Sequence, residues 1–197
     1  MNQTKQTRLD QIAADIVSHN ICADLAKTAT HMVPGEGNPN AAVVFIGEAP
    51  GKNEDLTGKP FVGAAGKFLD ELLQSVGMQR ANVFITSIVK YRPPNNRDPR
   101  PEEKEAFWPY MVRQLEVINP ALVVTLGRHS MGYFVPGKTI TQAHGQLIKG
   151  KHWPVLPLFH PAAALYNQNM RQTLIDDFKK VPQALKTLER NNANEQS

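Results

Sequence analysis

Four short β-rich segments, separated by helical patterns, constrain the fold of this chain more than any other feature. They are residues 43–46, 83–86, 122–126 and 155–159. Apolar residues recur at helical spacing between them, as in 68–76, and Pro101 followed by two acids is typical of a helix start. Strands that alternate with helices predict a three-layer α/β/α sandwich around a central, mainly parallel four-stranded sheet.

The length of 197 residues predicts one domain over residues 1–197. Residues 1–34 are expected to form a helical N-terminal region of this domain. A last helix is predicted from about 171 to 190, with Pro182 as a candidate kink. The polar residues 191–197 are expected to be a disordered tail.

Composition and charge narrow the class of protein. Lysine and arginine total 22 against 18 acids, so the net charge of +4 favours anionic partners. No apolar run approaches the ~18 residues of a membrane span, and residues 1–20 lack the apolar core of a secretory signal. We therefore expect a cytoplasmic protein without membrane partners. The single cysteine, Cys22, excludes an internal disulfide and a metal site built from several thiolates.

Ligands of open parallel sheets bind outside the carboxyl ends of the strands. The predicted sheet places four loops there, 47–63, 87–100, 127–130 and 160–170. They are the most unusual stretches of the sequence, and the predicted site lies where they meet.

The loop 47–63 is rich in glycine, proline and acids. Gly47 allows the backbone to approach a ligand closely. Residues 58–60, Gly-Lys-Pro, do not form a phosphate loop, because that motif needs Ser or Thr after the lysine. Phe61 either offers its ring face to a flat ligand or packs as ordinary core.

Three ionisable residues are candidates for catalysis. Glu48 and Glu54 either act on water and on developing positive charge, or accept backbone hydrogen bonds in a glycine-rich turn. His160 directly follows a strand, where it either donates to a ligand in the cleft or is a structural histidine. The proline-braced basic segment 90–97 favours phosphate contacts, with a solvated loop as the alternative.

Several motifs occur together in order and spacing. They are Gly47-Glu48-Ala49-Pro50-Gly51 with Glu54-Asp55, then Pro60-Phe61-Val62-Gly63, then Lys90 with Arg92-Pro93-Pro94, and finally His160-Pro161. In this combination the chain, from about 35 to 182, resembles the family 4 uracil-DNA glycosylases. The resemblance implies a DNA repair enzyme that hydrolyses the N-glycosidic bond of uracil in single- or double-stranded DNA and leaves an abasic site.

The resemblance also implies roles for individual residues. Phe61 would stack on an extruded uracil, and His160 would donate to the uracil oxygen that gains negative charge. Glu48 would position water, and Glu54 would act on water or on positive charge. The remaining implied contacts are to the base, through Gly47, Ala49 and Ser87, and to DNA, through Lys90, Arg92, Arg97 and Arg171, with Leu165 and Tyr166 as minor-groove wedges.

The chain departs from this family at the iron–sulfur cluster. Family 4 enzymes typically hold the cluster with four cysteines, whose places here look like His19, Cys22, Tyr91 and Phe107. Because tyrosine and phenylalanine cannot replace thiolates, we expect neither the cluster nor any other cofactor or metal. Tyr91 and Phe107 are instead expected to meet as an aromatic contact that fills the vacated volume.

A second departure is Ser87, which stands where the family has an asparagine that reads the pyrimidine edge. A serine hydroxyl is shorter and offers one donor, so uracil recognition is expected to be weaker, broader or lost. Two alternatives to a uracil-DNA glycosylase stay open. One is a DNA-binding protein without turnover, and the other is a hydrolase of another nucleoside or small glycoside. Residues 91–100 contain no histidine that could trap the sugar covalently. A monomer is expected.

Overall fold

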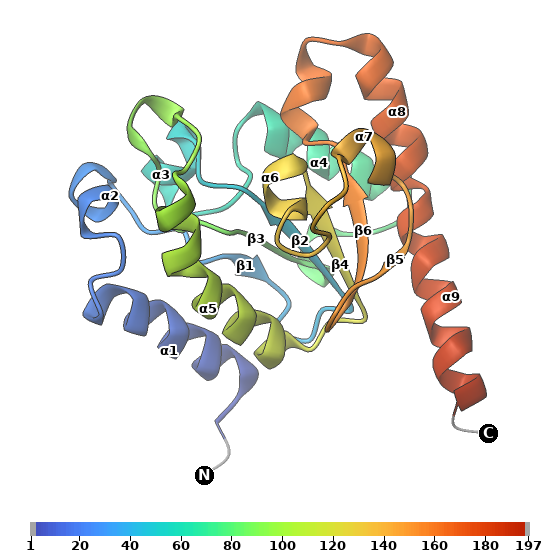
Figure 1. Ribbon diagram of the computed structural model, residues 1–197, viewed down its shortest axis with the longest axis horizontal. Helices are drawn as coiled ribbons and strands as arrows, with labels where there is room; N and C mark the ends of the chain where they lie inside the picture. Colours follow the sequence, from blue (N-terminus) through green and yellow to red (C-terminus); the bar gives the residue numbers. More distant parts are fainter. Residues whose placement is uncertain (1–2, 196–197) are drawn as a thin grey trace.

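The computed structural model describes residues 3–195, and at 192, 194 and 195 it describes only the backbone. A six-stranded sheet with the order β1-β3-β2-β4-β6-β5 runs through its centre (Figure 1). The inner strands are parallel to one another: β3 (Phe84–Ser87), β2 (Val43–Gly47), β4 (Leu122–Leu126) and β6 (Pro154–Leu158). The short strands β1 (Glu36–Gly37) and β5 (Ile148–Lys149) join the two edges antiparallel.

Helices cover both faces of the sheet, which confirms the predicted α/β sandwich (Figure 1). One face carries α1 (Lys5–Ser18) and α5 (Pro101–Ile118), and the other carries α4 (Ala64–Ser75), α8 (Gln168–Phe178) and α9 (Lys180–Glu195). The shorter elements are α2 (Ala23–Thr28), α3 (Lys52–Thr57), α6 (Arg128–Met131), α7 (Ile140–Ala143), η1 (Arg80–Asn82), η2 (Pro94–Asn96) and η3 (Pro161–Leu165). Sequence periodicity missed β1 and β5, because two residues carry no repeating pattern.

Alternate residues of the inner strands enter two separate hydrophobic cores. Val43 and Phe45 of β2 pack into the core beneath α4 and α8, whereas Val44 and Ile46 pack into the core beneath α1 and α5. The Phe45 ring stacks on Phe178 of α8 with 5.6 Å between the ring centroids. A strand that is buried on both faces reads as an unbroken apolar run, which explains why β2 is visible in the sequence.

The C-terminal region differs from the prediction in two respects. The single predicted helix is two helices, α8 and α9, which meet at Lys179 instead of bending at Pro182. Pro182 lies in the first turn of α9, where a backbone N–H has no partner within the helix, so proline is tolerated there. The helix α9 continues through 191–195, where a tail was expected, and residues 196–197 lie outside the described part.

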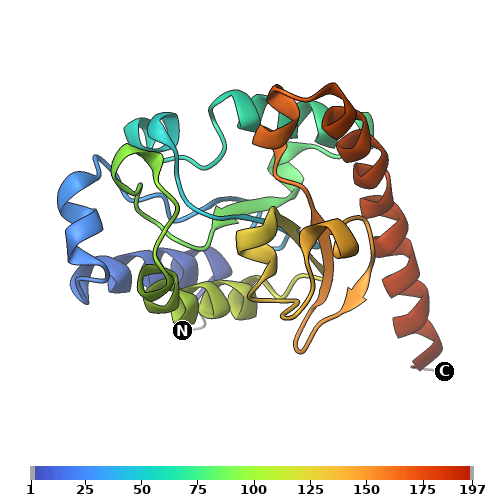
Figure 2. The same cartoon turned by 45° about the horizontal axis from the view of Figure 1, so that its top comes forward.

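The carboxyl ends of β2, β3, β4 and β6 meet at one edge of the sheet, as their parallel register requires. This end is at the top of Figure 1, and Figure 2 brings it toward the viewer. The segments that follow these strands surround it. Within residues 3–195, no helix combines the length and the apolar character needed to cross a membrane.

Candidate active site

A cavity of about 370 Å³ lies at the carboxyl ends of the inner strands. Its walls come from the segments after β2, β3 and β6, which were predicted to meet here. The predicted site residues that line it are Glu48, Ala49, Glu54, Phe61, Ser87, Arg97 and His160.

Phe61 forms one wall of the cavity in an unusual backbone conformation. Its φ of 50° lies in the left-handed region, which residues other than glycine rarely adopt. Two glycines make room for it: a Cβ on Gly66 would lie 1.8 Å from the Phe61 carbonyl oxygen, and one on Gly47 would lie 2.8 Å from the Phe61 ring. The residue is 8% exposed. Phe61 is therefore both packed against the protein and presented to the cavity.

The Phe61 ring stacks on the His160 ring, with 5.6 Å between the centroids and 28° between the planes. His160 follows β6, and its Nδ1 accepts the backbone N–H of Ala162 at 3.1 Å. A neutral imidazole that accepts at Nδ1 carries its proton on Nε2. Burial lowers the pKa of His160 to about 4, so the ring is neutral at physiological pH. His160 can thus offer a neutral Nε2–H donor to a ligand.

Glu54 is occupied by the loop that contains it. Its Oε1 accepts the backbone N–H groups of Val62 and Gly63 at 2.8 and 2.9 Å, and its Oε2 accepts the N–H of Gly51 at 3.1 Å. This is the alternative in which the carboxylate accepts backbone hydrogen bonds. In this structure the residue fixes the loop that carries Phe61, and its assignment to catalysis stays a prediction.

Glu48 lies directly after β2 and has a different environment. Its side chain is 20% exposed, and its Oε1 has no hydrogen-bond partner among the described residues. Burial, followed by the charge of Asp98, raises the pKa of Glu48 to about 7, against the opposing effect of Lys104 and Arg128. A carboxyl group with such a pKa can exchange protons near neutral pH.

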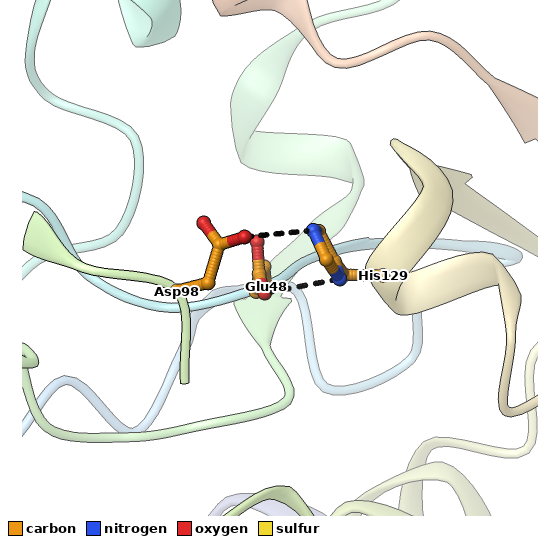
Figure 3. Close-up of side chains that lie close together, drawn as sticks. All are labelled: Glu48, Asp98 and His129. Atoms are coloured by element: carbon orange, nitrogen blue, oxygen red, sulfur yellow. Dashed lines mark ion pairs between the residues drawn. The ribbon is translucent and has the colours of Figure 1, made fainter. Parts of the chain in front are cut away.

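Two side chains that the sequence did not single out lie beside Glu48 (Figure 3). His129 of α6 has its Nδ1 3.4 Å from Glu48 Oε1 and its Nε2 3.4 Å from Asp98 Oδ2. One atom from each of the three side chains lies within 4.8 Å of the others. The two histidine nitrogens face different carboxylates, so we interpret the group as contacts of one imidazole ring with two carboxyl groups and not as a metal site. The sequence feature that could have pointed to His129 is its position in the loop after β4.

Ser87 is the last residue of β3, is 4% exposed and lines the cavity. Its Oγ lies 3.2 Å from the position that a Cβ on Gly47 would occupy. The hydroxyl group therefore lies near the Phe61 ring.

The family model of the uracil DNA glycosylase superfamily matches residues 34–186. This chain belongs to that superfamily. A type-4 uracil-DNA glycosylase of Archaeoglobus fulgidus is 47% identical over 182 residues, which cover 88% of this chain and 91% of the relative. Those of Saccharolobus solfataricus and Thermotoga maritima are 46% and 41% identical over 90% of this chain, and over 86% and 95% of their own lengths. The resemblance to family 4 is confirmed.

The DNA-binding role expected of Lys90 in this superfamily member is wrong. Lys90 is 0% exposed, and its Nζ donates to Thr86 Oγ1, the Ser87 carbonyl and Gln114 Oε1 at 2.7, 2.7 and 2.8 Å. Burial lowers its pKa. The side chain turns inward against α5 instead of toward solvent, so it cannot reach a phosphate.

The three arginines expected to contact DNA each have partners in the protein. Arg97 forms a two-point pair with Glu103 at 2.6 and 2.8 Å, and the Nε of Arg92 donates to Asn96 at 2.6 Å. Arg171 pairs with Glu71 at 2.7 Å, and its guanidinium lies 4.0 Å from the Phe68 ring centroid. Their contacts to DNA stay predictions.

The two proposed wedge residues protrude at the end of η3. Leu165 is 36% exposed and Tyr166 is 94% exposed. An apolar side chain must protrude in this way to enter a base step. Their role on DNA stays a prediction.

The four positions that correspond to the family's cluster ligands do not fit an iron–sulfur cluster. The Tyr91 and Phe107 rings meet edge to face with 5.9 Å between centroids, which confirms the predicted aromatic contact. His19 Nδ1 lies 2.9 Å from the Tyr110 hydroxyl. Burial raises the pKa of the Cys22 thiol to about 11, with Glu103 and Glu102 adding to the rise. One protonated thiol beside packed rings cannot replace four thiolates.

Proposed function

We propose that this protein is a DNA repair enzyme that hydrolyses the N-glycosidic bond of uracil in DNA and leaves an abasic site. The observation that carries the proposal is the pairing of Phe61 with a neutral His160 at one cavity, where the carboxyl ends of the strands meet. The type-4 relatives, which are named uracil-DNA glycosylases, support the substrate.

The geometry suits this reaction. Breaking the bond produces an oxocarbenium-like sugar and a uracil anion. An extruded uracil stacks on Phe61, and the Nε2–H of His160 donates to the oxygen on which negative charge develops. A neutral donor is suited to this task, because it stabilises the anion without having to lose its own proton. Glu48, when ionised, orients the attacking water and accepts its proton as the new C–O bond forms.

Strand cleavage tests the proposal. Oligonucleotides that carry one uracil, single- or double-stranded, are incubated with the protein, treated with alkali and examined for breaks. We expect breaks with the wild type and a loss of about 10²–10³ in rate with His160→Ala. The exposed His152 provides the matched control, and His152→Ala should retain the wild-type rate. An unchanged rate in His160→Ala would contradict the mechanism.

Ser87 favours a second candidate function, that of a damaged-base binding protein with little turnover. A hydroxyl group cannot reproduce the paired contacts of an amide, and the loss of such a pair removes about 1–3 kcal/mol of discrimination. Binding of uracil-containing DNA without breaks, in wild type and His160→Ala alike, would support this candidate. Turnover of free nucleosides without activity on DNA would support a hydrolase of small glycosides.

We further propose that the enzyme works without an iron–sulfur cluster, as a cytoplasmic monomer without membrane partners. The Tyr91–Phe107 contact and the single thiol support the first point. Iron analysis of protein purified without oxygen tests it, and stoichiometric iron with sulfide would contradict it. Light scattering of the purified protein tests the oligomeric state.

A further inference from the structure

His129 lies beside Glu48, the proposed water-orienting group (Figure 3). It belongs to α6, which begins one residue after Gly127 at the end of β4, and its side chain is 27% exposed. Its Nδ1 faces Glu48 Oε1 at 3.4 Å, and that oxygen is the atom without a hydrogen-bond partner among the described residues. Before substrate binds, catalytic hydrogen bonds are often this long.

Arg128 determines which nitrogen of His129 carries the proton. Its Nε donates to His129 Nε2 at 3.0 Å, and a guanidinium group can only donate. Nε2 is therefore an acceptor, and the proton of the neutral ring is on Nδ1, the nitrogen that lies 3.4 Å from Glu48 Oε1. Asp98 lies 3.8 Å from Arg128 NH2 and so favours the position of the guanidinium.

The charges around the ring agree with this tautomer. Burial and the positive charges of Lys104 and Arg128 lower the pKa of His129, while Asp98 acts in the opposite direction. The ring is thus neutral at physiological pH. A protonated ring would carry a hydrogen on Nε2 as well, and that hydrogen would conflict with the Arg128 donor.

We propose that His129 is a positioning residue for the reaction: its Nδ1–H, directed by Arg128, orients the Glu48 carboxylate and favours its ionised form. This inference rests on the proposed function, in which ionised Glu48 accepts the proton of water. A donor to the charged form of a carboxylate stabilises that form. Of the other charged groups near Glu48, Lys104 of α5 and Arg128 of α6 act in the same direction, and Asp98 opposes them.

Two substitutions of His129 by amide residues distinguish the contributions of the two ring nitrogens. In His129→Asn the amide nitrogen can occupy the place of Nδ1, whereas in His129→Gln it can occupy the place of Nε2. Uracil release is measured against pH in single turnovers at saturating DNA. With His129→Gln we expect the midpoint of the acid limb to move to a higher pH by about one unit. At pH values below that midpoint the rate should then be about tenfold lower than in the wild type, without a matching rise in KM. His129→Asn should restore the wild-type limb.

A direct titration of Glu48 makes the test independent of activity. The ¹³C carboxyl signal of Glu48, assigned by its loss in Glu48→Gln, is followed against pH in the wild type and both His129 variants. The inference requires a higher Glu48 pKa in His129→Gln than in His129→Asn. Equal Glu48 titrations in the two variants would overturn it, as would an unchanged acid limb in His129→Gln.

Glu48→Gln distinguishes the failure of this inference from the failure of the proposed function. If Glu48→Gln removes activity while both His129 variants behave as wild type, only the role of His129 is wrong. If Glu48→Gln keeps the wild-type rate and pH profile, the role of Glu48 is wrong and that of His129 falls with it. Absence of uracil release by the wild type would contradict the glycosylase itself.

Discussion

At the scale of single residues, the wall of the cavity depends on Gly47. A methyl group on this residue would lie 2.8 Å from the Phe61 ring, so the ring that is proposed to stack on uracil would have to shift. We expect Gly47→Ala to lower the rate of uracil release more than tenfold, and to cost about 1–3 kcal/mol of unfolding free energy because the site is overpacked. Single-turnover kinetics and thermal melting measure both effects.

Gly132 provides the control for this substitution. A Cβ there would meet its nearest neighbour at 3.7 Å, an ordinary contact, within helical backbone. Gly132→Ala should leave the rate unchanged. Wild-type activity in Gly47→Ala would show that the position of Phe61 does not limit the reaction.

The pH dependence of activity is also set by single residues. The raised pKa of Glu48, about 7, means that its ionised form is lost as the pH falls through neutrality, so the rate should fall below about pH 7. His160, with a pKa of about 4, stays neutral over the same range. The residual rate of Glu48→Gln should therefore be independent of pH between about 5 and 8. A surviving acid limb in that variant would assign the limb to another group.

At the scale of elements, an aromatic contact joins the segment after β3 to α5. Phe107 of α5 is 0% exposed and meets Tyr91 edge to face. We expect Phe107→Ala to lower the free energy of unfolding by about 3–5 kcal/mol. Denaturant unfolding measures this change. Val17→Ala, at a side chain that is 58% exposed, is the control, and an equal effect of the two substitutions would contradict the proposed link.

The elements also show what the sequence could and could not predict. The inner strands were predictable because burial on both faces makes them unbroken apolar runs, as in β2. Lys90 was misassigned because its environment is tertiary: its three acceptors include Gln114 of α5, which is distant along the chain. The prediction placed the break between α8 and α9 at Pro182 instead of Lys179. From the sequence alone, a proline in the first turn of a helix cannot be told from one in the helix interior.

The site was predictable to a similar extent. Glu48, Phe61 and His160 each follow a strand or belong to the loop after one, and parallel strands bring such loops together. The sequence left two roles open for Glu54 and did not single out His129, because the contacts of both residues depend on which atoms meet. The three backbone donors of Glu54 and the donor from Arg128 to His129 appear only in the folded chain.

At the scale of the whole molecule, we expect one exposed aromatic residue to act differently on duplex and on single-stranded substrate. Tyr166 is 94% exposed beyond η3, on the segment that follows His160. If it enters the stack as a base leaves, it assists only where a stacked duplex must be opened, at a few kcal/mol per step. Tyr166→Ala should therefore lower the rate on duplex at least tenfold more than on single strands. Equal losses on the two substrates would exclude a wedge.

The loop that presents Phe61 holds its shape without help from a ligand. Three backbone amides bound by one carboxylate, and two glycines that leave no room for a different course, fix the aromatic surface in the free protein. The loop that carries Phe61 is thus preorganised, and contacts with DNA need not change its shape. The free energy of association can instead drive the rotation of a nucleotide out of the DNA duplex. A base that is already unstacked does not require this step.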